Sequence, residues 1–244
     1  SPNHGEAIFL AKYHSDIAEF VTAADYYRRA QKSSERPVDY SYQIFESYAN
    51  AAWNDKIPFD EALPAANVVI ERKNAGNISK VAQLLSKLAR RREATDRIGP
   101  YLKAGISDSS ERRDDKGRKL NADLKADYAL HAEHDTLGAI AIKKAALGEN
   151  WTTDLNTYYP FGSWCYERRI NLVEAQRYVQ HACERASDGP FKARHLSLLA
   201  NICEAHGFID EAVRHAEQAV EQDPENESYT EQLDRLREAS GRKR

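Results

Sequence analysis

Apolar and small residues recur along the chain with the spacing of paired amphipathic helices. The first helix of the 196–224 segment presents an apolar face at positions i, i+3, i+4 and i+7, formed by Leu196, Leu199, Ala200 and Cys203. Gly207 predicts the end of that helix, because glycine readily takes the left-handed conformation of a helix C-terminus. Asp210 and Glu211 open a second helix, where acidic side chains suit the N-terminal dipole, and Pro224 ends the unit.

The same pair of helices is predicted elsewhere in the chain, at a spacing of 37 to 39 residues. Four alanines each follow, by three residues, an aromatic or aliphatic residue at the start of a second helix: Ala23 after Phe20, Ala62 after Phe59, Ala175 after Leu172 and Ala212 after Ile209. The 113 residues from Ala62 to Ala175 have room for three such periods. We therefore expect further units over 78–103 and 119–147, six helical hairpins in all, and a final amphipathic helix over 228–239.

The positions of the small residues resemble those of a known repeat family. In three units the small residue of the first helix precedes the alanine of the second by twelve, in the pairs Ala11 and Ala23, Ser163 and Ala175, Ala200 and Ala212. This pattern resembles the tetratricopeptide repeat, although the units are longer than the usual 34 residues of that family. The resemblance implies an all-α, superhelical solenoid as a single domain over residues 1–244. An unrelated helical bundle with alanine-rich interfaces is the alternative.

A second resemblance bears on the context of the chain. The segment 170–187, which follows the aromatic residues Trp164 and Tyr166, resembles repeats found after a thioredoxin-like domain in some exported bacterial proteins. The sequence contains no methionine, so we expect it to be a region of a longer protein. It also lacks a signal-peptide pattern and any apolar run long enough to span a membrane, and its localisation is left open.

Charge is distributed unevenly along the chain, although the net charge is only −3. From Lys80 to Lys125 there are 13 basic and 7 acidic residues, whereas from Glu204 to Glu238 there are 11 acidic and 3 basic residues. The run Arg90-Arg91-Arg92 is interleaved with acids and lacks neighbouring aromatic residues. This pattern favours a solvated helix face over a nucleic-acid interface.

No motif in the sequence indicates an enzyme or a cofactor. We find no nucleophile elbow, phosphate-binding glycine loop, zinc-protease motif or dinucleotide fingerprint. His131 and His134 could share one helix face, but two histidines without a third ligand do not make a metal site. The three cysteines are predicted to be small buried hydrophobic residues, and a Cys183–Cys203 bridge is left open.

The remaining candidate site is the concave groove that the first helices of a solenoid line. We predict that a protein or peptide partner, either an extended peptide or a helix, binds there through polar residues opposite the packed faces. These groove residues are Lys12, Asn54, Trp164, Glu167, Arg168, Arg194, Asn201 and Glu204. The lysine and asparagine positions of the family's carboxylate clamp are not matched. The polar stretch 105–117 is expected to be an irregular connector.

Two other functions are consistent with the sequence. The chain could be the accessory repeat region of a multidomain enzyme, such as a thioredoxin-like redox enzyme, whose catalytic part lies outside it. It could also be a structural oligomer that self-associates through its first or last repeat.

Overall fold

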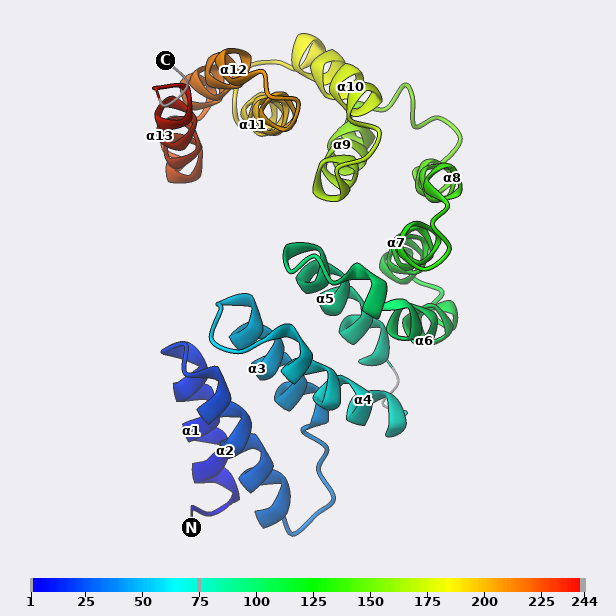
Figure 1. Cartoon of the computed structure of the whole chain (residues 1–244), viewed down its shortest axis with the longest axis vertical. Helices are drawn as coiled ribbons and strands as arrows, with labels where there is room; N and C mark the ends of the chain where they lie inside the picture. The colour runs from blue at the N-terminus through cyan, green and yellow to red at the C-terminus, as the bar shows by residue number, and fades with distance from the viewer. Residues whose placement is uncertain (1, 74–75, 242–244) are drawn as a thin grey trace. The chain divides into compact units, whose positions relative to one another are not determined.

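The computed structural model describes residues 2–73 and 76–241, and throughout these residues the chain is all-helical (Figure 1). The thirteen α-helices there are α1 (His4–Asp16), α2 (Phe20–Ser33), α3 (Ser41–Trp53), α4 (Leu63–Glu71), α5 (Ile78–Arg91), α6 (Gly99–Ser110), α7 (Asp115–His131), α8 (Thr136–Ala146), α9 (Leu155–Arg168), α10 (Leu172–Arg185), α11 (Pro190–Ala205), α12 (Ile209–Gln222) and α13 (Glu227–Gly241). Two short 3-10 helices, η1 (Phe59–Ala62) and η2 (Thr95–Arg97), precede α4 and α6. The predicted all-α repeat fold is confirmed.

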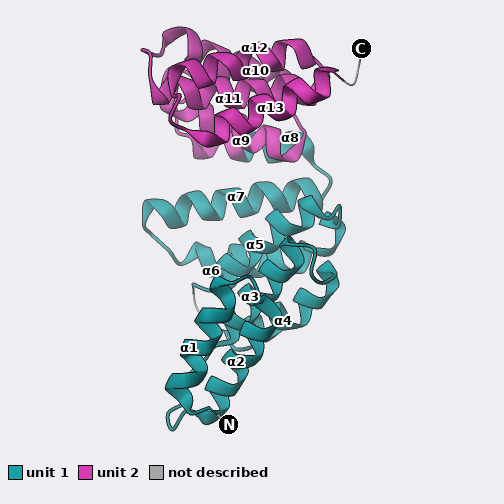
Figure 2. Ribbon diagram, turned by 90° about the vertical axis from the view of Figure 1, so that its left-hand side faces the viewer, with its two compact units in different colours: residues 1–142 teal, residues 143–244 magenta. Residues whose placement is uncertain are grey.

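Contacts divide the chain into two compact units, Ser1–Ile142 and Lys143–Arg244 (Figure 2). The single superhelical domain over residues 1–244 stays a prediction.

Sequential helices pack as antiparallel hairpins in the predicted register. Helix α1 packs on α2, α3 on α4 and α5 on α6 in the first unit, and α9 packs on α10 and α11 on α12 in the second. The predicted starts of the second helices are correct, because Phe20, Phe59, Leu172 and Ile209 begin α2, η1, α10 and α12. The four alanines that defined the period, Ala23, Ala62, Ala175 and Ala212, have no exposed surface. Small side chains at these positions let the paired helices approach closely.

Similar turns link consecutive helices in the predicted hairpins. Each of the six turns contains at least one residue with positive φ: Ala18, Asp55, Glu93, His134, Gly207, and both Arg169 and Asn171 in the turn before α10. In five turns the amide of the next residue donates to a carbonyl five residues earlier, as from Glu19 to His14 at 2.8 Å and from Phe208 to Cys203 at 2.9 Å. This bond is the Schellman arrangement that satisfies the last carbonyls of a helix. Five of the six turns therefore share this hydrogen bond, although among their residues named above only Gly207 is a glycine.

The stretch 105–117, expected to be an irregular connector, is mostly helical. Residues 105–110 complete α6 and residues 115–117 begin α7, so only the turn 111–114 is irregular. Pro100 lies in the first turn of α6, where its missing N–H is not needed. Gly105 is buried where α6 crosses α5, with the methyl group of Ala82 directly opposite. The prediction was wrong because the polar composition of this stretch is typical of a loop. Gly105 was also interpreted as a loop residue, although it lies at a close helix crossing.

A buried polar network joins α5 to α7 within the first unit. Asp127 of α7 is 3% exposed, and it accepts hydrogen bonds from the hydroxyl group of Ser86 and from Nη1 of Arg90, the latter at 3.2 Å. Both donors belong to α5, and Ser86 is 2% exposed. Around this network, the apolar core includes Leu85, Leu88, Leu102 and Leu124, all at most 1% exposed.

Candidate functional site

The helices α11 and α13 of the second unit are joined by a ladder of polar side chains. Gln232 of α13 donates from Nε2 to the Oδ1 atom of Asn201 at 2.7 Å and to the backbone oxygen of Ser197 at 3.0 Å. In return, the Ser197 hydroxyl donates to Oε1 of Gln232 at 2.8 Å. These α11 positions follow helical spacing with Arg194 and Glu204, as the sequence predicted. The ladder fixes the amide groups of Asn201 and Gln232 in defined orientations.

Charged and aromatic side chains lie at both ends of this ladder. At one end, Arg235 of α13 donates from both terminal nitrogens to the carboxylate of Glu204, with Nη2 to Oε2 at 2.9 Å. This bidentate pairing, together with the nearby Tyr166, raises the pKa of the Arg235 guanidinium.

At the other end, the Arg194 guanidinium carbon lies 4.4 Å from the ring centroid of Tyr159 in α9. Burial, and to a lesser extent Asp223 and Tyr159, raise the pKa of Tyr229, while Arg194 lowers it. Helices α9, α11 and α13 thus form one face, which we call the α11 face, defined by Tyr159, Tyr166, Arg194, Ser197, Asn201, Glu204, Tyr229, Gln232 and Arg235.

The prediction that Trp164 and Arg168 face an open groove is wrong. Trp164 is 4% exposed, and the Arg168 guanidinium carbon lies 4.8 Å from its ring centroid. The Arg168 side chain is only 6% exposed and donates to the backbone oxygen of Trp164 at 3.3 Å. The large indole gains more from burial in the packed face of α9 than from exposure. Glu167 remains accessible, with a side chain that is 48% exposed.

Two predicted groove residues, Lys12 and Asn54, belong to the first unit. Both are exposed, Lys12 on α1 and Asn54 immediately after α3. The Asn54 side chain donates to the backbone oxygen of Asn50 at 2.8 Å, so it satisfies a carbonyl at the end of its own helix. Since these residues and the α11 face lie in different units, they are not parts of one described site.

The arginines at the C-terminal end of α5 and just after it form ion pairs with acidic residues of the preceding hairpin. Arg92 donates to the Asp55 carboxylate in the turn after α3, and Arg91 lies 3.8 Å from the same group. Arg97 pairs with Asp60 of η1. These ion pairs join successive helical hairpins within the first unit. This agrees with the interpretation of the basic stretch as a solvated structural face.

The two histidines considered as metal ligands do not share a helix face. Helix α7 ends at His131, and His134 lies in the following turn with a φ of 57°. Throughout residues 2–73 and 76–241, there is no group of three His, Cys, Asp or Glu side chains that could hold a metal ion. No helix in the same residues is long and apolar enough to cross a membrane.

The three cysteines are buried free thiols. Burial raises the pKa of Cys165 and of Cys183 to about 12 and that of Cys203 to about 11. A thiol in this state is a poor nucleophile, because the thiolate is the reactive form. Cys183 and Cys203 therefore do not form a disulfide bridge in this structure. None of the three cysteines has the lowered pKa that is typical of a redox-active cysteine.

We expect these thiols to react slowly in the folded protein. With dithionitrobenzoate at pH 8, labelling should be at least about tenfold slower than in urea, where all three react as ordinary cysteines. In the folded protein the pKa values of these thiols lie above the value of about 8.5 in the unfolded chain. The buried thiols therefore contribute fully to stability below about pH 8.5, and this contribution is lost as the pH rises through their pKa values in the folded protein. One fast equivalent in the native protein would contradict the burial.

Comparison with known proteins finds similar chains among solved structures. No protein-family model matches the sequence, and no curated protein matches it. Among solved structures, the chain is similar to a tetratricopeptide repeat protein from Parabacteroides merdae, with 11% sequence identity and a TM-score of 0.41 over 96% of this chain and 98% of that chain. It is also similar to the TPR2AB domain of yeast Sti1 in a complex with pHSP90, with 13% identity and a TM-score of 0.35 over 96% of both chains.

Sequence reasoning missed the residues that α13 and α9 contribute to the α11 face. Helix α13 was predicted only as a final amphipathic helix over 228–239, although Tyr229, Gln232 and Arg235 recur at intervals of three residues and so share one side of it. This three-residue interval could have predicted that these side chains lie together on one side of α13. The hairpins themselves, with their buried alanines, give the chain an all-α helical repeat fold.

Proposed function

We propose that the chain is a protein-interaction module that binds an extended peptide or a partner helix along the α11 face. The observation that carries this proposal is the fixed ladder of amide and hydroxyl groups between α11 and α13, with an arginine and tyrosines at its ends. Fixed amides can pair with a peptide backbone, and tyrosine and arginine are the side chains most often found at the energetic centre of protein interfaces. The proposed role is binding and needs no catalytic group in this chain.

Arg194 is the residue that best separates binding from folding on this face. Its side chain is exposed and its recorded contacts are ring contacts with Tyr159 and Phe191. Replacing it should change the free energy of unfolding by no more than about 1 kcal/mol, the value of an exposed cation–π contact. A charged hydrogen bond lost from a complex would cost roughly 1.5–3 kcal/mol, or about ten- to a hundredfold in affinity.

The test is a selection of random 12-residue peptides on the immobilised protein, followed by fluorescence polarisation with the enriched peptides. We expect Arg194→Ala to weaken binding about tenfold or more. Arg214→Ala is the matched control, because Arg214 lies on α12 of the same unit with its side chain 70% exposed. Equal affinity for both variants would remove the site from the α11 face, and a selection that enriches no peptide would contradict the proposal itself.

A further inference from the structure

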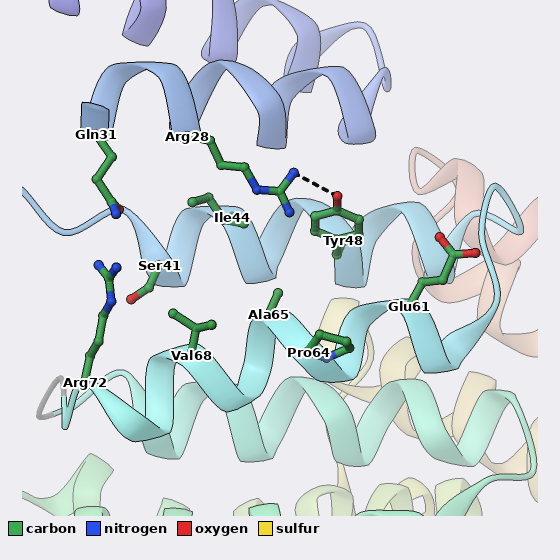
Figure 3. A pocket seen from close by; sticks show the side chains of 10 residues that line it. All are labelled: Arg28, Gln31, Ser41, Ile44, Tyr48, Glu61, Pro64, Ala65, Val68 and Arg72. Carbon is green, nitrogen blue, oxygen red and sulfur yellow. Dashed lines mark hydrogen bonds between the residues drawn. The ribbon is translucent and has the colours of Figure 1, made fainter. Parts of the chain in front are cut away.

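A groove runs along the first unit between α2 and α4, with α3 as its floor (Figure 3). Helix α3 packs against both of the helices that form its walls. The cavity has a volume of about 500 Å³, which lies within the range of binding sites for small molecules and short peptides. Its lining consists of Arg28, Gln31, Ser41, Ile44, Tyr48, Glu61, Pro64, Ala65, Val68 and Arg72.

One end of the groove brings together three hydrogen-bond donors. Gln31 of α2 accepts from the backbone amide of Tyr40 through Oε1 at 3.1 Å, which directs the donor NH2 group of its side chain to the groove end. Arg72, the residue that follows α4, uses Nη1 for Asp39 at 2.7 Å and carries four further N–H donors. Figure 3 shows Gln31, Ser41 and Arg72 pointing toward one another from α2, from α3 and from the end of α4.

The Ser41 hydroxyl is the distinctive group at this end. Ser41 is 2% exposed, and its Oγ atom is buried without a hydrogen-bond partner in the protein. The backbone amide of Ser41 donates to the Asp39 carboxylate at 2.9 Å, and the hydroxyl lies near the same carboxylate, whose pKa it helps to lower. A buried hydroxyl without a partner is costly to the fold, and its presence beside a cavity indicates that it serves a bound group.

The middle and the far end of the groove have different chemistry. Ile44, Ala65 and Val68 form an apolar surface in the middle, where Val68 is 38% exposed. At the far end, the Glu61 carboxylate lies beside Tyr48, whose hydroxyl accepts a hydrogen bond from Arg28 at 3.0 Å. The groove is thus donor-rich at the Arg72 end and acidic at the Glu61 end.

Charge balance decides which polar group fits the donor end. Arg72 is paired with Asp39, and Arg28 with Asp25 at 2.7 Å, so neither arginine presents an uncompensated positive charge. Burial raises the pKa of Asp39, but hydrogen bonds from Ser41 and Arg72 outweigh this effect and keep that pKa below its ordinary value, so Asp39 stays ionised at neutral pH. A neutral carbonyl group is therefore a better complement to the three donors than a carboxylate, which Asp39 would repel.

We propose that this groove binds a short extended peptide, with a main-chain carbonyl at the donor end, an aliphatic side chain on the apolar middle and a basic side chain at Glu61. Ser41 and Tyr48 are seven residues apart on α3, about 10 Å along the helix, which three extended residues span. This site lies in a different unit from the α11 face and on different helices, so it does not depend on the function proposed there.

The probe is a positional-scanning library of acetylated, amidated tripeptides, which carry no terminal charge. Binding is followed on the full chain by methyl NMR of Ile44 and Val68. We expect the largest shifts from mixtures with Lys or Arg at one terminal position and Leu, Ile or Val in the middle. Shifts that show no preference for residue type, or a preference for acidic residues, would overturn the proposal.

Variants then test the individual contacts with the tripeptide that the library selects. Val68→Glu should weaken binding at least about tenfold, whereas Val173→Glu, at a valine that is 76% exposed in the other unit, should leave it unchanged. Glu61→Gln should abolish the preference for a basic residue, and Arg214→Ala, on α12 of the other unit, should have no effect. Circular dichroism checks that each variant is folded.

Ser41→Ala separates a ligand-binding role from a structural one. Because the hydroxyl has no partner in the protein, its removal should leave the melting temperature unchanged or raise it. The same variant should bind the selected tripeptide severalfold more weakly. A lower melting temperature together with unchanged affinity would show that the hydroxyl serves the fold, and would contradict the proposed contact.

Discussion

Replacing Asp127 by alanine is expected to lower the free energy of unfolding by about 3–5 kcal/mol. The carboxylate is nearly fully buried between α5 and α7, where it accepts hydrogen bonds from Ser86 and Arg90. The variant leaves the Arg90 guanidinium, with a side chain that is 13% exposed, without this counter-charge in a poorly solvated position. Such a loss costs more than a surface ion pair, since the remaining charge cannot recover its hydration. Urea denaturation followed by circular dichroism measures the change.

The control for this experiment lies on the same helix. Asp115 begins α7, has a side chain that is 64% exposed, and pairs with Lys119 at 2.8 Å. Its replacement by alanine should leave the denaturation midpoint almost unchanged, because surface ion pairs are screened by water and salt. If the two variants had the same denaturation midpoint, Asp127 would have to be solvated and the described network would be wrong.

The periodicity of small residues predicted the fold because burial leaves few alternatives at those positions. Ala23, Ala62, Ala175 and Ala212 lie where two helices come closest, and a larger side chain there would force the helices apart. An aromatic or aliphatic residue three positions earlier begins the second helix in each case. These local requirements repeat in four hairpins, and a single sequence displays them as a period.

The turns between paired helices were less visible in the sequence. Ala18, Asp55, Glu93, His134 and Arg169 all adopt positive φ without being glycine. The penalty of the left-handed conformation, about 1–2 kcal/mol for most residues, is offset by the helix-ending hydrogen bonds and by the packing of the hairpin. Tertiary contacts thus override a local preference, so the sequence signalled only the turn with Gly207.

The candidate site could be predicted only in part. Helical spacing placed Arg194, Asn201 and Glu204 on one side of α11, but it could not tell that α13 would contribute Gln232 and Arg235 to the same face. The same spacing placed Trp164 in the groove although its ring is buried, since an amphipathic pattern does not rank the sides of a helix that packs on several neighbours. The groove between α2 and α4 was not predicted, because it depends on how three helices are spaced.

Gly105 gives the second large expected effect, and it tests the helix crossing that the sequence concealed. A Cβ atom at this position would lie 2.4 Å from Cβ of Ala82 and 3.2 Å from Cδ1 of Leu124. Neither alanine nor the surrounding helix backbone can rotate away, so a larger side chain must separate α5 from α6. We expect Gly105→Leu to lower the free energy of unfolding by about 3 kcal/mol, at the upper end of the range for overpacked cores.

Gly5 in α1 is the control position for this experiment. A Cβ atom added there would have only ordinary contact with one neighbour, Oδ1 of Asn3 at 3.6 Å. Gly5→Ala should leave stability unchanged or raise it by about 0.5–1 kcal/mol, since alanine restricts the unfolded chain and favours the helix. Thermal melts of the two variants should therefore move in opposite directions or differ by several degrees. If Gly105→Leu melted with the parent protein, residues 105–110 would not pack on α5, and the original expectation of an irregular connector would be restored for that segment.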